Sequence, residues 1–231
     1  MKRFWKAVTV AAASDGDGHA IMLDGRPVRT PARAPLAVPS AALAAAIAAE
    51  WSAQAADIDA RTMPLTGLAN AAIDHAARDP AAFAATLTPF AETDLLCYRD
   101  DREPKLAAEQ AAAWNPLLAW AETRFGTQFA LVQGVMHLAQ PIATIATLQA
   151  AIHTLPPFRL AALSPLVTIS GSLVAALAVE TGARDAAELW PILCLDALYQ
   201  ERQWGSDTLA QAQRAAHERD WMSAAKFLSL V

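Results

Sequence analysis

The chain has 231 residues, of which 55% are hydrophobic and 18% are charged. This composition excludes an intrinsically disordered chain, which combines low hydrophobicity with high charge. Eighteen Lys and Arg residues against 23 Asp and Glu residues give a net charge of −5, so the whole-chain charge shows no footprint for nucleic acid or anionic lipid. The two cysteines, Cys97 and Cys194, are too few for a disulfide framework and fit a reducing compartment.

The first forty residues predict a small sheet. Short β-prone segments alternate with turn residues, and the strands that we expect cover residues 4–10, 19–23, 26–30 and 36–38. The glycine-rich stretch 14–19 supplies one turn. The pair Asp24-Gly25 is a strong signal for a two-residue hairpin, so the strands on either side of it should be antiparallel.

From residue 40 onward the sequence becomes helical. Ser40 is a good N-cap for a helix over 41–56. Within that helix Leu43, Ile47 and Trp51 recur every four residues and form one apolar stripe, which is typical of a helix packed on a core.

Proline, glycine and capping residues mark the later helices. Thr66 can cap one helix, Asp79-Pro80 starts the next, and a long helix opened by Pro104 ends at Gly126, with Pro116 expected to kink or split it. The predicted helices after the first cover residues 66–78, 80–95, 104–125, 144–153, 158–179, 186–203 and 207–230, and a further strand covers 128–137.

These elements predict an α+β fold. We expect a small N-terminal antiparallel β-sheet with helices over residues 1–126, followed by a mainly α-helical C-terminal domain over residues 127–231. Because no Gly/Ser-rich or charged linker separates the two parts, we expect a packed boundary near Gly126.

One segment has the length of a membrane span. Residues 160–179 carry no charge, and twenty apolar residues are enough to cross a bilayer. Pro165 and Gly171 interrupt this segment and Glu180 follows it directly, so we favour a helix buried inside the protein over a membrane tether. The basic N-terminus resembles a secretory signal, but Lys6 breaks its apolar stretch and a strand fits better.

The residues alone make no positive case for catalysis. The sequence contains no glycine-rich phosphate loop, and its histidines lack metal-ligating spacing, so we expect no cofactor and no metal. An enzyme of unknown substrate stays an alternative. It would require two or more of four reactive side chains to converge in one pocket with perturbed pKa values. The four are His75, Asp94, Cys97 and Asp196.

Asp196 stands out among the carboxylates. It lies in the segment LCLDALYQERQWG, where apolar residues are followed at once by a cluster of polar ones. The segment is either an ordinary amphipathic helix that ends at Gly205 or a polar patch used for recognition, and the residue pattern leaves both interpretations open.

Taken together, the motifs resemble one family of assembly chaperones of the F1 part of ATP synthase, the family that binds the F1 α subunit. The matching segments keep their order along nearly the whole chain. They are RFWK at 3–6, LDGRPVRTP at 23–31, PLAVPS at 35–40, AEW at 49–51, MPLTGLANAAID at 63–74, TDLLCYR at 93–99, WNPLLAW at 114–120, SLVAALAV at 172–179 and LDALYQERQWGSD at 195–207.

The resemblance implies a chaperone and not an enzyme. Such a protein holds newly made α subunit by the surface that later pairs with β, and it thereby prevents aggregation. It needs no cofactor, nucleic acid or stable membrane insertion, and we expect a monomer. Members of the family occur in the mitochondrial matrix and in related bacteria. Because the chain starts almost at RFWK, without an Arg/Ser-rich presequence, we expect a bacterial cytoplasmic protein.

The resemblance also directs attention to the C-terminal part. It implies that an acidic residue there is important, and Glu188, Asp196 and Glu201 are the candidates. Ala197 departs from the family pattern, in which an acidic residue more often follows the Asp. Aromatic side chains are favoured anchors at protein interfaces. The candidate partner-binding residues are therefore Glu188, Asp196, Tyr199, Gln200, Glu201 and Trp204.

Overall fold

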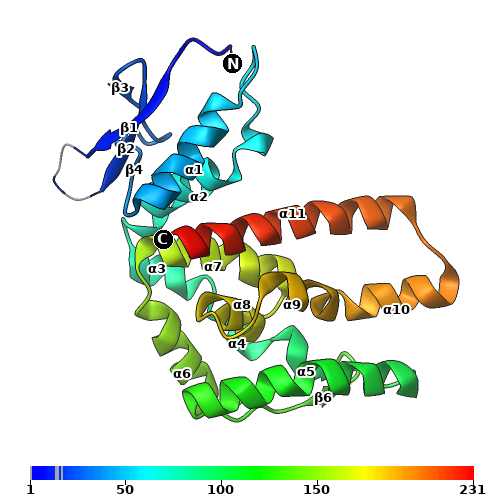
Figure 1. Ribbon diagram of the computed structural model, residues 1–231. Coiled ribbons are helices and arrows are strands. Elements are labelled where there is room, and N and C mark those ends of the chain that lie inside the picture. Colours follow the sequence, from blue (N-terminus) through cyan, green and yellow to red (C-terminus); the bar gives the residue numbers. More distant parts are fainter. Residues whose placement is uncertain (1, 14–15, 17) are drawn as a thin grey trace. The chain divides into compact units, whose positions relative to one another are not determined.

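The computed structural model describes residues 2–13, 16 and 18–231 (Figure 1). The chain packs as two units, and neither is one continuous segment. The first unit comprises Met1–Phe83, Pro156–Ala162 and Lys226–Val231, and the second comprises Ala84–Leu155 and Leu163–Ala225. The boundary near residue 126 is predicted between domains that would fold independently, which is a different property from packing as a unit. That boundary stays a prediction. The predicted α+β fold class is confirmed.

The first unit contains the N-terminal sheet. Its strands are β1 (Val8–Ala12), β2 (His19–Leu23), β3 (Arg26–Pro27) and β4 (Ala37–Val38), and β2 pairs antiparallel with the other three. The hairpin turn at Asp24-Gly25 is confirmed, because both residues have positive φ, 47° and 77°. The predicted turn at 14–19 includes residues 14, 15 and 17, which lie outside the described residues.

Two of the predicted strands differ in extent. The first begins at Val8 and not at residue 4, because the Asp24 carboxylate accepts hydrogen bonds from the backbone of Lys6 and Ala7 and holds that stretch outside the sheet ladder. The third ends at Pro27, and the chain then turns through Arg33, which has φ 68°.

Helix α1 (Ala41–Ser52) covers the sheet in the first unit. Ser40 caps it by accepting the Leu43 N–H at 3.0 Å, and Leu43 and Ile47 are fully buried, as their stripe predicts. The helix is four residues shorter than predicted. Trp51 is half-buried and packs edge-on against Trp5, with 5.1 Å between ring centroids.

The prediction that Thr66 caps the next helix is wrong. After the short helix η1 (Ala60–Thr62), helix α2 (Pro64–Ala71) begins at Pro64 and continues into the π-helical turn η2 (Ala72–Ala76). The cap comes from α1 instead. The Glu50 carboxylate accepts the N–H groups of Leu65 and Thr66, both at 2.8 Å, and thereby satisfies the first turn of α2.

The long apolar stretches are divided into shorter helices. Residues 80–95 form α3 (Pro80–Ala85), α4 (Pro89–Glu92) and part of η3 (Leu95–Cys97), because Pro89 starts a new helix. Residues 157–180 form α7 (Pro157–Ser170) and α8 (Leu173–Glu180), because Gly171 has φ 69° and Ser172 caps the second helix. Residues 186–204 form α9 (Ala186–Leu193) and α10 (Leu195–Trp204), which are separated at Cys194.

Three more helices and a pair of parallel strands lie wholly or mostly in the second unit. Helix α5 (Pro104–Phe125) has its predicted bounds, ends at Gly126 with φ 68°, and stays one helix through Pro116. The predicted strand 128–137 is reduced to β6 (Val132–Gln133), which pairs in parallel with β5 (Tyr98–Arg99). Helices α6 (Ile142–His153) and α11 (Thr208–Leu230) complete the chain.

The uncharged segment 160–179 lies inside the protein. Seven of the eight residues of α8 are buried, and so are several residues of α7 around Leu163. The side chain of Asp94 is 0% exposed and links η3 to the start of α8. It accepts the Leu96 N–H of η3 at 3.0 Å and the Val174 N–H of α8 at 2.9 Å. Within the described part of the chain, no helix has the length and apolarity to cross a membrane.

Candidate partner-binding surface

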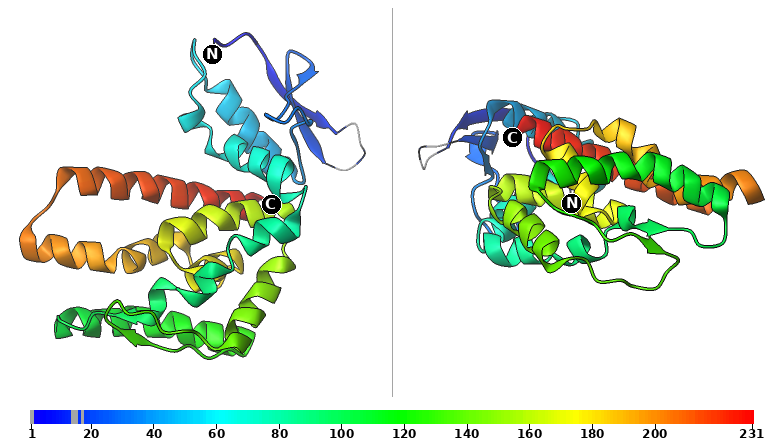
Figure 2. Two further views of the ribbon diagram at one scale, coloured as in Figure 1. Left: turned by 180° about the vertical axis from the view of Figure 1, so that it is seen from behind. Right: turned by 90° about the horizontal axis from the view of Figure 1, so that it is seen from below.

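Five of the six candidate residues lie on α10, which forms an antiparallel hairpin with α11 (Figure 2). Gly205, with φ 89°, ends α10, and Asp207 opens α11 by accepting the Leu209 N–H at 2.7 Å. Glu201 joins the two helices, because its carboxylate accepts hydrogen bonds from Gln211 and, at 2.7 Å, from Arg214. These bonds lower the pKa of Glu201, that from Gln211 most, so its carboxylate stays ionised at neutral pH.

The tip of this hairpin exposes two large apolar side chains. Trp204 and Leu209 are each 79% exposed. Trp204 also borders a hollow of about 280 Å³, together with Gln200, Glu201 and Arg214. An exposed tryptophan beside charged and amide groups is the composition that protein interfaces favour.

The other three candidates, Tyr199, Glu188 and Asp196, are placed differently. Tyr199 is 5% exposed, so its ring packs inside the unit, with the Arg202 guanidinium 5.3 Å from the ring centroid. Glu188 is exposed in the first turn of the preceding helix, α9. The structure therefore brings Gln200, Glu201 and Trp204 together around one hollow.

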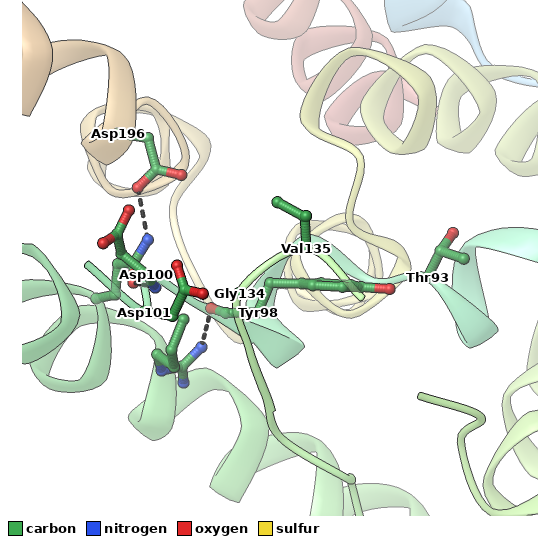
Figure 3. Close-up of a pocket in the computed structure, with 9 residues that line it drawn as sticks. Thr93, Tyr98, Asp100, Asp101, Gly134, Val135 and Asp196 are labelled. Atoms are coloured by element: carbon green, nitrogen blue, oxygen red, sulfur yellow. Dashed lines mark hydrogen bonds between the residues drawn. The ribbon is translucent and has the colours of Figure 1, made fainter. Parts of the chain in front are cut away.

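Asp196 lies on another side of α10, in a groove of about 450 Å³ (Figure 3). Its Oδ1 accepts a hydrogen bond from the Gln110 side chain at 2.8 Å, and the Gln110 Oε1 accepts the Asp100 N–H at 2.7 Å. Gln110 is 4% exposed, so this bridge holds Asp196 in a fixed position. Residues that line the groove include Thr93, Tyr98, Asp100, Asp101, Gly134 and Val135.

A buried arginine lies at the bottom of this groove. Arg99 donates to the carbonyls of Leu96 and Tyr98, both at 2.7 Å, and to Asn115 Oδ1 at 2.6 Å. Burial lowers the pKa of Arg99, while the charge of Asp196 acts in the opposite sense. Because Arg99 shares the groove with three aspartates, Asp100, Asp101 and Asp196, the groove keeps an acidic character.

Sequence reasoning missed an exposed apolar segment near this groove. Between β6 and α6 the side chains of Val135 and Met136 are 93% and 79% exposed, and Leu138 is half exposed. The apolar run predicted a strand, but Gly134, with φ 79°, turns the backbone out of the ladder. That glycine inside the run was the signal available in the sequence.

Cys97, one of the four reactive side chains, lies in the interior of the second unit. Its side chain is fully buried, and burial raises the pKa of the Cys97 thiol to about 12, with the Asp94 charge adding to the effect. The thiol is therefore protonated at neutral pH and a poor nucleophile. The oxygens of Asp94 accept the backbone N–H groups of Leu96 and Val174, and His75 lies in η2.

Comparison with known proteins gives a consistent result. The model of the ATP12 chaperone protein family matches residues 2–122, just over half of the chain. The chain is 27% identical over 217 residues to the mitochondrial protein atp12 of Schizosaccharomyces pombe, covering 89% of this chain and 74% of that protein.

Two solved structures have the same fold. The crystal structure of Atp12 from Paracoccus denitrificans superposes with a TM-score of 0.93 at 39% identity, over 99% of this chain and 97% of that one. The Atu1473 protein of Agrobacterium tumefaciens gives a TM-score of 0.94 at 39% identity, over 99% and 85% of the two chains.

Proposed function

Because the chain belongs to the ATP12 chaperone family, whose members act in ATP synthase assembly, we propose that it binds the unassembled α subunit of F1 and keeps it from aggregating until α pairs with β. The observation that carries this proposal is the exposed apolar tip of the α10–α11 hairpin, formed by Trp204 and Leu209 beside the polar groups of α10.

Holding an unassembled subunit requires no chemical step. A subunit that has not yet assembled exposes the apolar surface that its partner will cover. A chaperone with an apolar anchor and a polar rim can cover that surface reversibly, without a cofactor or a catalytic step. We accordingly propose a non-enzymatic monomer that acts in the bacterial cytoplasm and recognises protein and not nucleic acid.

Co-expression with the α subunit of its own organism tests the proposal. The wild-type chain should co-purify with α and raise the soluble fraction of α. Trp204→Ala should weaken capture by about 2 kcal/mol, roughly thirtyfold in affinity, as for a tryptophan anchor. Because Trp204 is exposed, this variant should fold normally.

The matched control is Phe4→Ala, which removes another exposed aromatic side chain, on the first unit. It should capture α as well as the wild type does. Equal capture by all three proteins would contradict the assignment of the hairpin tip, and failure of the wild type to bind α would contradict the proposed partner.

A further inference from the structure

The segment between β6 and α6 presents an apolar lip, which we define as Val135, Met136 and Leu138. Its exposure is fixed by the fold. On one side the Gly134 N–H donates to the Arg99 carbonyl at 2.8 Å. On the other side the buried side chain of Gln140 bonds both the N–H and the carbonyl of Ala130, at 2.9 and 2.8 Å. The lip is therefore held in an anchored loop with its side chains directed outward.

The lip adjoins the acidic groove directly. Val135 and Gly134 line the same groove as Asp196, and a Cβ placed on Gly134 would lie 2.7 Å from Asp101 Oδ2. Figure 3 shows the three labelled aspartates at one end of the groove and Thr93 at the other, with Val135 and the Tyr98 ring between them. One face of the second unit thus places an apolar surface next to carboxylates.

The groove carries three carboxylates, those of Asp100, Asp101 and Asp196, against one buried guanidinium, that of Arg99. Asp100 accepts the backbone N–H groups of Glu103 and Arg102, and these bonds lower its pKa, so its carboxylate stays ionised. Asp101 forms an ion pair with the largely exposed Arg102, at 3.9 Å. An ion pair of that kind contributes little. The groove therefore attracts a cationic group.

We propose that the groove and the lip together bind an extended client segment in which an Arg or Lys side chain is followed by apolar residues. The basic side chain enters among the aspartates, and the apolar residues cover Val135 and Met136. The inference rests on the proposed function, in which the client is the F1 α subunit, and it adds the chemistry of the segment that is recognised. Charge complementarity selects this occupant over an acidic or purely apolar one.

A model peptide tests this chemistry without the α subunit. The probe is a fluorescent peptide of valine and leucine with one central arginine, and its control has glutamate at that place. The full-length chain should bind the arginine peptide at least tenfold more tightly, and added salt should weaken this binding. Equal binding of the two peptides, or no binding of the arginine peptide at millimolar concentration, would overturn the inference.

Variants locate the binding site. The double substitution Val135→Ser with Met136→Ser should weaken arginine-peptide binding about tenfold, since it removes two exposed anchors. Asp101→Asn should weaken it about two- to fivefold, as for a partly exposed ion pair. Phe4→Ala is the control, and it should leave binding unchanged. Wild-type affinity in the double serine variant would refute the role of the lip.

The two proposals fail separately. Capture of α that depends on Trp204, together with no preference for the arginine peptide, would overturn the inference and leave the proposed function standing. Lip-dependent binding of the arginine peptide without capture of α would support the groove and contradict the assigned client.

Discussion

Asp94→Asn tests how burial and ionisation are balanced at the start of α8. The side chain is 0% exposed, and its two oxygens accept the N–H groups of Leu96 and Val174. Burial raises the pKa of Asp94 from 3.8 to about 6, against the effect of these hydrogen bonds. An asparagine cannot ionise, and it offers one acceptor oxygen in place of two.

The loss of the ionisable group and the loss of one acceptor oxygen change the free energy of unfolding in opposite directions. Because the folded-state pKa lies above the unfolded one, the stabilising effect of Asp94 is complete below pH 3.8 and is lost as the pH rises through about 6. The difference between the two pKa values corresponds to about 3 kcal/mol in the free energy of unfolding. Against this, the variant leaves one buried N–H without an acceptor, which costs about 1–3 kcal/mol at every pH.

We therefore expect the variant to be less stable than the wild type near pH 5, with a deficit that shrinks or reverses near pH 8. Urea unfolding followed by tryptophan fluorescence at both pH values gives the two free energies of unfolding. Asp220→Asn, at an exposed position of α11, is the control and should show no such trend. A deficit that stays constant between the two pH values would show that Asp94 ionises as an exposed carboxyl does, and the reasoning from burial would be wrong.

Three further substitutions test the packing and the backbone. Trp114→Ala removes a side chain that is 1% exposed and donates to the Ile192 carbonyl at 3.0 Å, so it should lower the free energy of unfolding by about 3–5 kcal/mol in a urea titration. Trp51→Ala should lower it by less in the same titration, because Trp51 is half-buried, and equal losses would contradict this ranking. Gly171→Ala places a Cβ at φ 69° and should lower the melting temperature by an amount equivalent to about 1–2 kcal/mol, whereas an unchanged melting temperature would show that the turn adjusts freely.

Local rules predicted the parts of the fold that depend on neighbouring residues. The Asp24-Gly25 hairpin turn, the Ser40 cap and the bounds of α5 all follow from residues within a few positions. The cap of α2 could not be predicted in this way, because its acceptor is Glu50, on the preceding helix. The hydroxyl of Thr66 offers a local cap, and it therefore predicts a helix start that is two residues too late.

Strong apolar runs concealed the helix breaks. The pair Gly171-Ser172 is a helix end followed by an N-cap, and both signals are present in the sequence. The uncharged run on both sides of this pair nevertheless predicts one long helix over 158–179. The same bias predicted a strand over 128–137, where Gly134 turns the chain and leaves Val135 exposed.

The candidate site was predictable only as a segment. The pattern around Asp196 and Trp204 marked α10 as a surface of interest, and the structure places Trp204 at an exposed tip. The bridge from Gln110 to Asp196 spans 86 positions of the chain, and periodicity carries no information about such contacts. The burial of Tyr199 was hidden for the same reason, since an amphipathic helix shows which face is apolar but not what covers it.

The most direct test of the central claim follows aggregation of the isolated F1 α subunit. Denatured α is diluted into buffer, light scattering is recorded with and without an equimolar amount of this chain, and β is then added. The proposed function predicts that the chain suppresses scattering without nucleotide and that β releases α from it. Equal scattering in the presence and absence of the chain would contradict a chaperone role toward α.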